Sequence, residues 1–167
     1  MPSVDLTAEA IPLHRQPVDV GVLIELTTEV LQIQARALGV TLTIHIDEEV
    51  PDIVSIDRDK VAWAIASLVG AALRYVRGRD GFIALHVGFG DSSGTLRFSV
   101  RDNGPGISAE QLKRLLQREN WHPGGALGLL LVQDIAVAHG GSLAIESQND
   151  REDHFTEVAF TIPVRLG

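Results

Sequence analysis

The spacing of hydrophobic residues changes several times along the chain, and these changes restrict the fold more than any other feature. Over residues 20–38, apolar residues recur every three or four positions, which predicts a helix that stops before Gly39. From Val40 to Ile46 they recur at every second position, which predicts a half-buried strand. A second helix is expected to begin after Asp57 and to end near Val76. The predicted buried face of the first helix holds Leu23, Leu26, Val30, Ile33 and Ala37.

The second half of the chain is predicted to hold mostly strands. Alternating segments at 83–89 and 96–100 flank a turn rich in Gly and Ser, which indicates a β-hairpin. A short helix is expected over 108–117, and a longer one runs over 127–138 and ends at two glycines. Two further strands close the chain around a polar turn. This order predicts an α+β fold, a two-layer α/β sandwich whose mixed, mostly antiparallel sheet is covered on one face by helices.

The composition supports a single domain and excludes several classes of function. The chain has 167 residues, of which 45% are hydrophobic and 22% charged, as in ordinary globular proteins. Its net charge of −8 argues against a nucleic-acid partner and against contact with an anionic membrane. No apolar run is long enough to span a membrane, and the chain has no cysteine, so we expect a cytoplasmic location. No spacing of His, Asp and Glu suggests a metal site.

One carboxylate is predicted to point inward at the end of a core strand. The period-2 pattern places Asp102 on the same strand face as Phe98 and Val100. It could organise its own Asp-Asn-Gly turn, which is a common role for Asp. It could instead contact a ligand, since Gly104 and Gly106 would let the backbone approach a flat or bulky group closely. Both interpretations remain open at this point.

A second glycine cluster, at residues 124–129, lies immediately before the helical residues Leu131, Val132 and Ile135. Backbone N–H groups at the start of a helix can bind phosphate, and the helix dipole favours an anion there. A flexible loop or close packing of the helix would explain the same glycines. The presence of two such clusters, one beside an inward-facing Asp, favours a ligand site.

These two clusters resemble the glycine boxes of the GHKL superfamily of ATP-binding domains. Asp102-Asn103-Gly104-Pro105-Gly106-Ile107 resembles the first box, and residues 124–129 resemble the second. The run QDIAVAHGGSLAIES is similar to the segment that follows the second box in bacterial sensor histidine kinases. The resemblance covers the chain from about Gln16 to Val164 and implies a Bergerat-type sandwich. It implies a histidine-kinase-like ATP-binding domain over 16–167 and the end of an upstream linker or dimerisation helix over 1–15.

The resemblance also implies a nucleotide-binding site. In it, Asp102 would accept a hydrogen bond from the adenine N6 amine, and an ionised carboxylate would disfavour the O6 acceptor of guanine. Arg74 and Tyr75 would offer a cation for phosphate and an aromatic ring for the nucleotide. The remaining residues implied to bind the nucleotide are Gly104, Gly106, Ile107, Gly124, Gly125, Leu127, Gly128 and Leu129.

Three segments depart from the family pattern. The asparagine box would place two asparagines on the second helix, but Ser67 and Ala71 occupy those positions. Mg²⁺ is expected from the family, yet Ala71 has no side-chain oxygen to bind it, so no catalytic residue or metal ligand is assigned. The segment 115–121 lacks the phenylalanine of the family's lid, and Ala126 replaces a glycine of the second box.

The resemblance implies the ATP-binding catalytic domain of a sensor histidine kinase. Such a domain would bind ATP or ADP and present ATP to a histidine on a separate dimerisation domain, and a response regulator would be a further partner in two-component signalling. The departures leave a second hypothesis, a degenerate regulatory module with weak, Mg²⁺-independent or no nucleotide binding. A gyrase-type ATPase is disfavoured because the box lacks the expected glutamate. An anti-sigma-factor serine kinase stays open, but the His139-Gly140-Gly141 run fits sensor kinases better.

Overall fold

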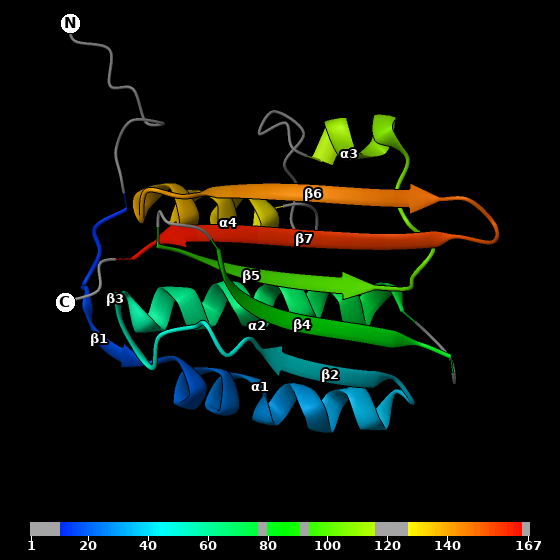
Figure 1. Ribbon diagram of the computed structural model, residues 1–167. Helices are drawn as coiled ribbons and strands as arrows, with labels where there is room; N and C mark the ends of the chain where they lie inside the picture. The colour runs from blue at the N-terminus through cyan, green and yellow to red at the C-terminus, as the bar shows by residue number, and fades with distance from the viewer. Residues whose placement is uncertain (1–10, 77–79, 91–93, 116–126, 165–167) are drawn as a thin grey trace, which may run out of the picture.

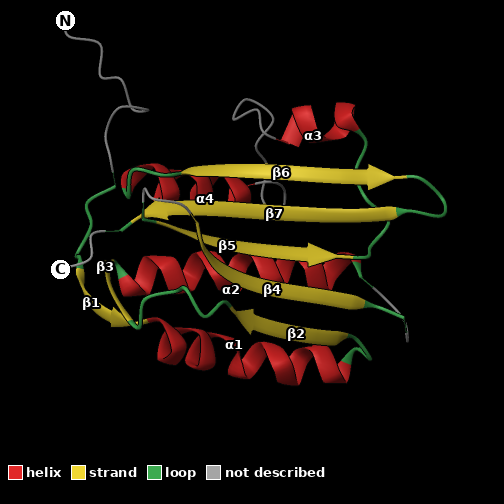
Figure 2. Ribbon diagram, viewed as in Figure 1, coloured by secondary structure: helices red, strands yellow, loops and turns green. Residues whose placement is uncertain are grey.

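A five-stranded sheet forms one layer of the molecule and helices form the other (Figures 1 and 2). The computed structural model describes residues 11–76, 80–90, 94–115 and 127–164. The strand order is β2-β4-β5-β7-β6, in which β2 and β4 are parallel and the other neighbours antiparallel. The predicted α+β sandwich is therefore confirmed. The strands are β2 (Thr41–Ile46), β4 (Phe82–Gly90), β5 (Thr95–Asp102), β6 (Ser142–Asn149) and β7 (His154–Pro163).

Three longer helices cover one face of this sheet. They are α1 (Val20–Ala37), α2 (Arg58–Tyr75) and α4 (Leu127–Ala138), and the short α3 spans Ala109–Leu115. Capping carboxylates define the starts of the first two helices. Asp19 accepts a hydrogen bond from the backbone N–H of Val22, and Asp57 accepts one from Lys60.

Two short strands were not predicted from the sequence. β1 (Gln16–Asp19) pairs antiparallel with β3 (Ile53–Ile56) as a separate two-stranded sheet. Each has four residues, which is too few for a period-2 pattern to stand out. The preceding residues 11–15 carry no helix, and the backbone N–H of His14 donates to Asp57 at 2.9 Å.

The buried face of α1 differs from the predicted one. Leu26, Val30 and Ile33 are each at least 60% exposed. The helix instead buries the stripe that contains Ile24, Thr28, Leu31 and Ala35. Thr28 can lie in this stripe because its hydroxyl donates to the carbonyl of Ile24 at 2.7 Å. The helix therefore has two apolar stripes. The stripe that packs against the sheet and α2 is the less hydrophobic one, because it includes Thr28.

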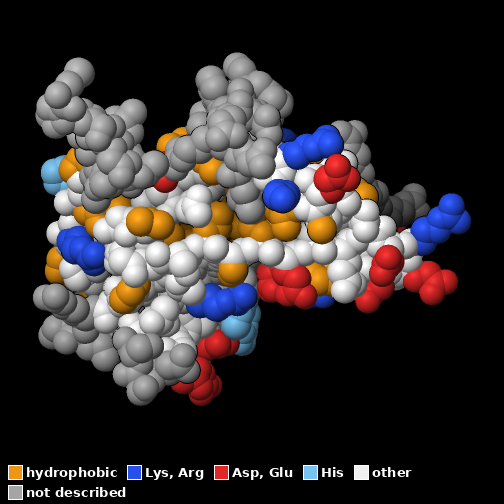
Figure 3. Space-filling model, turned by 90° about the horizontal axis from the view of Figure 1, so that it is seen from above, with side chains coloured by type: hydrophobic (Ala, Val, Ile, Leu, Met, Phe, Trp, Pro, Cys, Tyr) orange, Lys and Arg blue, Asp and Glu red, His pale blue; other side chains and the backbone are white. Residues whose placement is uncertain are grey.

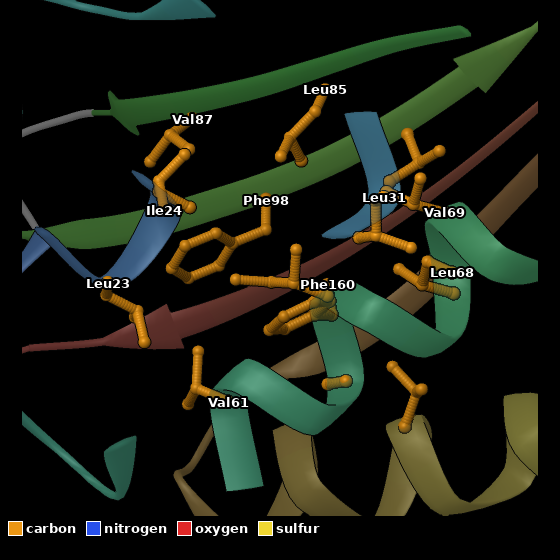
Figure 4. Close-up of a cluster of buried hydrophobic side chains, with 14 of the residues drawn as sticks. Leu23, Ile24, Leu31, Val61, Leu68, Val69, Leu85, Val87, Phe98 and Phe160 are labelled. Atoms are coloured by element: carbon orange, nitrogen blue, oxygen red, sulfur yellow. The ribbon is translucent and has the colours of Figure 1, made fainter. Parts of the chain in front are cut away.

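The core lies between the sheet and the helices (Figure 4). Phe98 of β5 and Phe160 of β7 stack with their ring centroids 4.9 Å apart, and Leu68 of α2 lies on the helix side of the core. No helix of the described residues covers the opposite face of the sheet (Figure 2). Among the described residues, no helix is both long and apolar enough to cross a membrane.

Seen from the side of β6 and α3, the surface is mixed in character (Figure 3). Hydrophobic side chains run across the middle of the visible face, and charged side chains gather mostly around its edges. Both signs of charge are present on this face.

Candidate functional site

Asp102 occupies the last position of β5 and faces the helix layer, as the strand pattern predicts. It is only 8% exposed. Its Oδ1 accepts a hydrogen bond from the backbone N–H of Gly104 at 2.8 Å, while Oδ2 has no hydrogen bond within the described part of the chain. Burial raises the pKa of the carboxyl group, and the Gly104 hydrogen bond partly opposes this rise. One oxygen therefore organises the turn, and the other can accept a hydrogen bond from a ligand.

Asn103 fixes the start of the loop that follows Asp102. Its side-chain amide donates to the carbonyl of Asp80 at 2.6 Å, and its oxygen accepts from the backbone N–H of Phe82 at 2.8 Å. The backbone N–H of Asn103 also donates to the Phe82 carbonyl at 3.2 Å. These hydrogen bonds hold the loop against the start of β4. Asp102 is therefore fixed by strand β5 before it and by the bonded Asn103 after it.

The β6–β7 hairpin holds the rest of this loop. The backbone N–H of Ile107 donates to the hydroxyl of Ser147 at 2.7 Å. A ring nitrogen of His154, Nδ1, lies 2.6 Å from the carbonyl oxygen of Gly104. Sequence reasoning did not assign a role to His154 or Ser147. Both residues lie at least 40 positions from their loop partners, so no local pattern could have linked them.

The two glycines of this loop, Gly104 and Gly106, are needed because other parts of the protein lie too close to leave room for a side chain. Gly106 has φ +76°, and a Cβ there would collide with the backbone carbonyl of Gln148. A Cβ on Gly104 would lie 2.9 Å from Asp102 Oδ1 and 3.5 Å from the side chain of Val76. The glycines therefore bring three segments together at Asp102: the loop itself, the β6–β7 hairpin and the end of α2.

The end of α2 carries the other predicted site residues on this side. A Cβ on Gly104 would be 3.6 Å from the carbonyl oxygen of Tyr75, so the helix end adjoins the Asp102 turn. The Tyr75 side chain is 67% exposed, which excludes the role of an ordinary core aromatic. Arg74 is also exposed. Both side chains are therefore accessible to solvent at the end of α2, which adjoins the Asp102 turn.

The second glycine cluster is described only in part. α4 begins at Leu127, as predicted, so Gly128 and Leu129 lie in its first turn. A Cβ on Gly128 would meet no atom within 4 Å, whereas Leu129 packs at the edge of the core. Gly124, Gly125 and Ala126 lie outside the described residues, as does the lid segment after Leu115.

The residues at the asparagine-box positions do not fit a magnesium site. Ser67 and Ala71 lie one turn apart on α2, and both are half-buried. Mg²⁺ prefers carboxylate and carbonyl oxygens in near-octahedral geometry. Ser67 contributes one hydroxyl, Ala71 contributes only a methyl group, and both lie within a helix that uses their backbone carbonyls.

His139 has a structural role at the end of α4. Its side chain is buried, with Nδ1 2.8 Å from the carbonyl of Ile135 and Nε2 accepting from the backbone N–H of Asp57 at 3.2 Å. Burial lowers the pKa of this imidazole, which agrees with a neutral ring. The histidine therefore joins the end of α4 to the start of α2.

The whole arrangement matches a family of ATP-binding domains. The family model "Histidine kinase-, DNA gyrase B-, and HSP90-like ATPase" matches residues 56–166. The chain is 33% identical over 172 residues to the histidine protein kinase DivJ of Caulobacter vibrioides, covering 96% of this chain and 27% of DivJ. It is 27% identical over 160 residues to the adaptive-response sensory kinase SasA of Synechocystis, covering 91% of this chain and 40% of SasA.

Solved structures show the same fold. Full-length ShkA in complex with AMPPNP superposes with a TM-score of 0.81 at 24% identity, covering 96% of this chain and 33% of ShkA. The catalytic domain of the histidine kinase ThkA gives 0.75 at 23% identity, covering 90% of this chain and 96% of that domain.

The chain belongs to the histidine kinase-, DNA gyrase B- and HSP90-like ATPase family. Within it, the chain corresponds to the ATP-binding catalytic domain of histidine kinases, the transferases of two-component signalling. It spans 27–40% of the length of the two curated relatives described above.

Proposed function

We propose that this chain binds an adenine nucleotide through Asp102 and presents ATP to a histidine on a separate dimerisation domain. The observation that supports this most strongly is the buried carboxylate of Asp102, which has one oxygen in a hydrogen bond to Gly104 and the other available. An ionised carboxylate can only accept hydrogen bonds. The adenine N6 amine is a donor of matching chemistry, whereas guanine would place its O6 acceptor against the same oxygen.

Protonation would weaken this interaction. Burial raises the pKa of Asp102, so the carboxyl group takes up a proton at a higher pH than an exposed aspartate would. The protonated group loses the negative charge that makes its hydrogen bond to the amine strong. Nucleotide affinity should therefore fall as the pH is lowered through the raised pKa of this group.

The phosphates would lie between the end of α2 and the start of α4. Arg74 supplies an exposed cation, and the first turn of α4 supplies backbone N–H groups with Gly128 and Leu129. Gly124, Gly125 and Leu127 complete the proposed phosphate border, and Gly106 and Ile107 complete the adenine border. The protein would contribute orientation and stabilisation of developing charge to phosphoryl transfer. Residues 16–167 would form this domain in a cytoplasmic setting, with a response regulator as the later phosphoacceptor.

One observation favours a second candidate function. Because Ser67 and Ala71 do not fit a magnesium site, the domain could bind adenine nucleotides without metal and act as a regulatory module. A phosphotransfer assay separates the two functions. The purified chain is mixed with ATP and a dimerisation domain that carries a phosphoacceptor histidine. Phosphohistidine supports the catalytic function, whereas nucleotide binding without phosphohistidine supports the regulatory one.

A further inference from the structure

Three potential metal ligands meet on the uncovered face of the sheet, away from Asp102. His45 on β2 and His86 on β4 are paired directly across the parallel strands. Asp47 follows β2, and its backbone N–H donates to the carbonyl of Val87 at 2.9 Å, which continues the same register. Because side chains alternate along a strand, His45 and Asp47 share one face. That face is the one opposite the helices, since Ile44 and Ile46 pack against the core.

The three side chains converge on one point. Asp47 Oδ1 lies 3.2 Å from His45 Nε2 and 2.8 Å from His86 Nε2. All three ligand atoms lie within 4.8 Å of one another. The two imidazole rings stack with centroids 5.7 Å apart and an interplanar angle of 19°. Ligands of one tetrahedral zinc ion lie about 3.3–3.6 Å apart, because each is about 2.0–2.2 Å from the metal.

Small side-chain movements would therefore admit an ion. His45, Asp47 and His86 have side-chain exposures of 74%, 31% and 41%, so they can separate by a few tenths of an ångström. Gly88 lies beside the cluster and has no side chain to crowd it, whereas a Cβ at this position would lie only 3.3 Å from Asp47 Oδ2. Two imidazole nitrogens together with one carboxylate oxygen suit zinc and related transition metals, whereas magnesium prefers sites in which all the ligands are oxygens.

The charges around the cluster also favour a cation. The Asp47 carboxylate supplies an acceptor oxygen, Oδ1, to both imidazoles of the cluster. Arg97 of the neighbouring strand β5 is the register partner of Gly88, and its Nη2 lies 3.9 Å from Glu157 Oε2. The net charge of the chain is −8.

We propose that His45, Asp47 and His86 form a surface site for a divalent transition-metal ion of the zinc class, with its remaining coordination positions open to water. The ion would link the edge strand β2 to β4 in addition to the backbone hydrogen bonds that already pair these strands. The site is independent of the nucleotide site, so either proposal can fail without the other. Sequence spacing could not reveal it, because His86 lies 39 residues from Asp47 and only the parallel register brings them together.

The test is calorimetric titration of the EDTA-treated chain with zinc chloride in the absence of nucleotide. We expect one ion per chain at saturation. The variants Asp47→Asn and His86→Gln should each bind zinc at least tenfold more weakly. Two matched controls, Glu48→Gln and His14→Gln, change an exposed neighbouring carboxylate and a histidine outside the cluster, and both should bind as the unchanged chain does.

A second measurement guards against a variant that misfolds. Histidine ring resonances of the unchanged chain are followed by NMR during the zinc titration, and those of His45 and His86 should shift before those of the other four histidines. Absence of saturable zinc binding overturns the proposal. So does undiminished affinity in both cluster variants, or a first response at any other histidine.

Discussion

Replacement of Asp102 by asparagine should abolish most adenine-nucleotide binding without unfolding the domain. In the unchanged chain, Oδ1 accepts from the Gly104 N–H at 2.8 Å and Oδ2 is available to the adenine amine. An asparagine has only one oxygen. If that oxygen accepts from Gly104, the amide NH₂ faces the adenine amine, donor against donor, and the reverse orientation sets the NH₂ against the Gly104 N–H.

The size of the effect follows from the charge of the acceptor. A hydrogen bond to a charged group contributes about 1.5–3 kcal/mol, which corresponds to a loss of about 10- to 150-fold in affinity. Fold stability should not fall at neutral pH. Because burial raises the pKa of Asp102, its ionised form is less favourable in the folded chain than in the unfolded chain, and the neutral amide removes this cost.

The assay is calorimetric titration of Asp102→Asn with ATP, ADP and GTP, together with thermal unfolding without ligand. Asp80→Asn is the matched control, since Asp80 contacts the loop through its backbone carbonyl and its side chain is exposed. The preference for ATP over GTP should shrink in Asp102→Asn and stay unchanged in Asp80→Asn. Unchanged ATP affinity in a folded Asp102→Asn chain would refute the adenine assignment.

Three further predictions concern the fold and the metal dependence. Gly106→Ala should lower the unfolding free energy, because its Cβ would collide with the backbone of β6, whereas Gly70→Ala in the open interior of α2 should raise it by about 0.5–1 kcal/mol in urea unfolding. Burial lowers the pKa of His139, so between about pH 6.5 and this lowered pKa the unfolded state binds more protons than the folded state does. The unfolding free energy should therefore fall as the pH falls through this range. Thermal unfolding at pH 7.5 and 5.5 should show a smaller pH dependence for His139→Gln than for the unchanged chain. Ala71→Asn should make ATP binding stronger with Mg²⁺ than without it, and a titration that shows no gain with metal would mean that more than one ligand is missing.

The order of the main elements could be predicted from the sequence because hydrophobic spacing reflects how an element is buried. The helix over 20–38 and the strand over 40–46 both correspond to elements of the structure. The choice between two apolar stripes on α1 could not be predicted, because it depends on the sheet and α2 that pack against the helix. Thr28 illustrates this, because its polar side chain is buried on the face that packs. Its hydroxyl donates a hydrogen bond to the backbone carbonyl of Ile24 within the helix, which offsets the free-energy cost of burying a polar group.

The candidate site could be predicted only where its residues are close in sequence. The inward direction of Asp102 followed from strand alternation, and the structure confirms its burial. The contact of His154 with Gly104 and the cluster around Asp47 depend on strand register over long separations. The glycine at position 106 was predicted to allow a ligand to approach, but in the structure its close neighbour is the backbone of β6.

We infer that Asp102 makes this chain a receptor for adenine nucleotides. The most direct test of this inference is calorimetric titration of the unchanged chain with ADP, ATP and GTP, each with and without Mg²⁺. We predict one adenine nucleotide per chain, binding of GTP that is at least about tenfold weaker than that of ATP, and ADP affinity that changes little when Mg²⁺ is added. A ligand at about 100 times its Kd should also raise the unfolding free energy by about 2.7 kcal/mol. Equal binding of GTP and ATP, or no binding of any nucleotide with or without metal, would contradict this account.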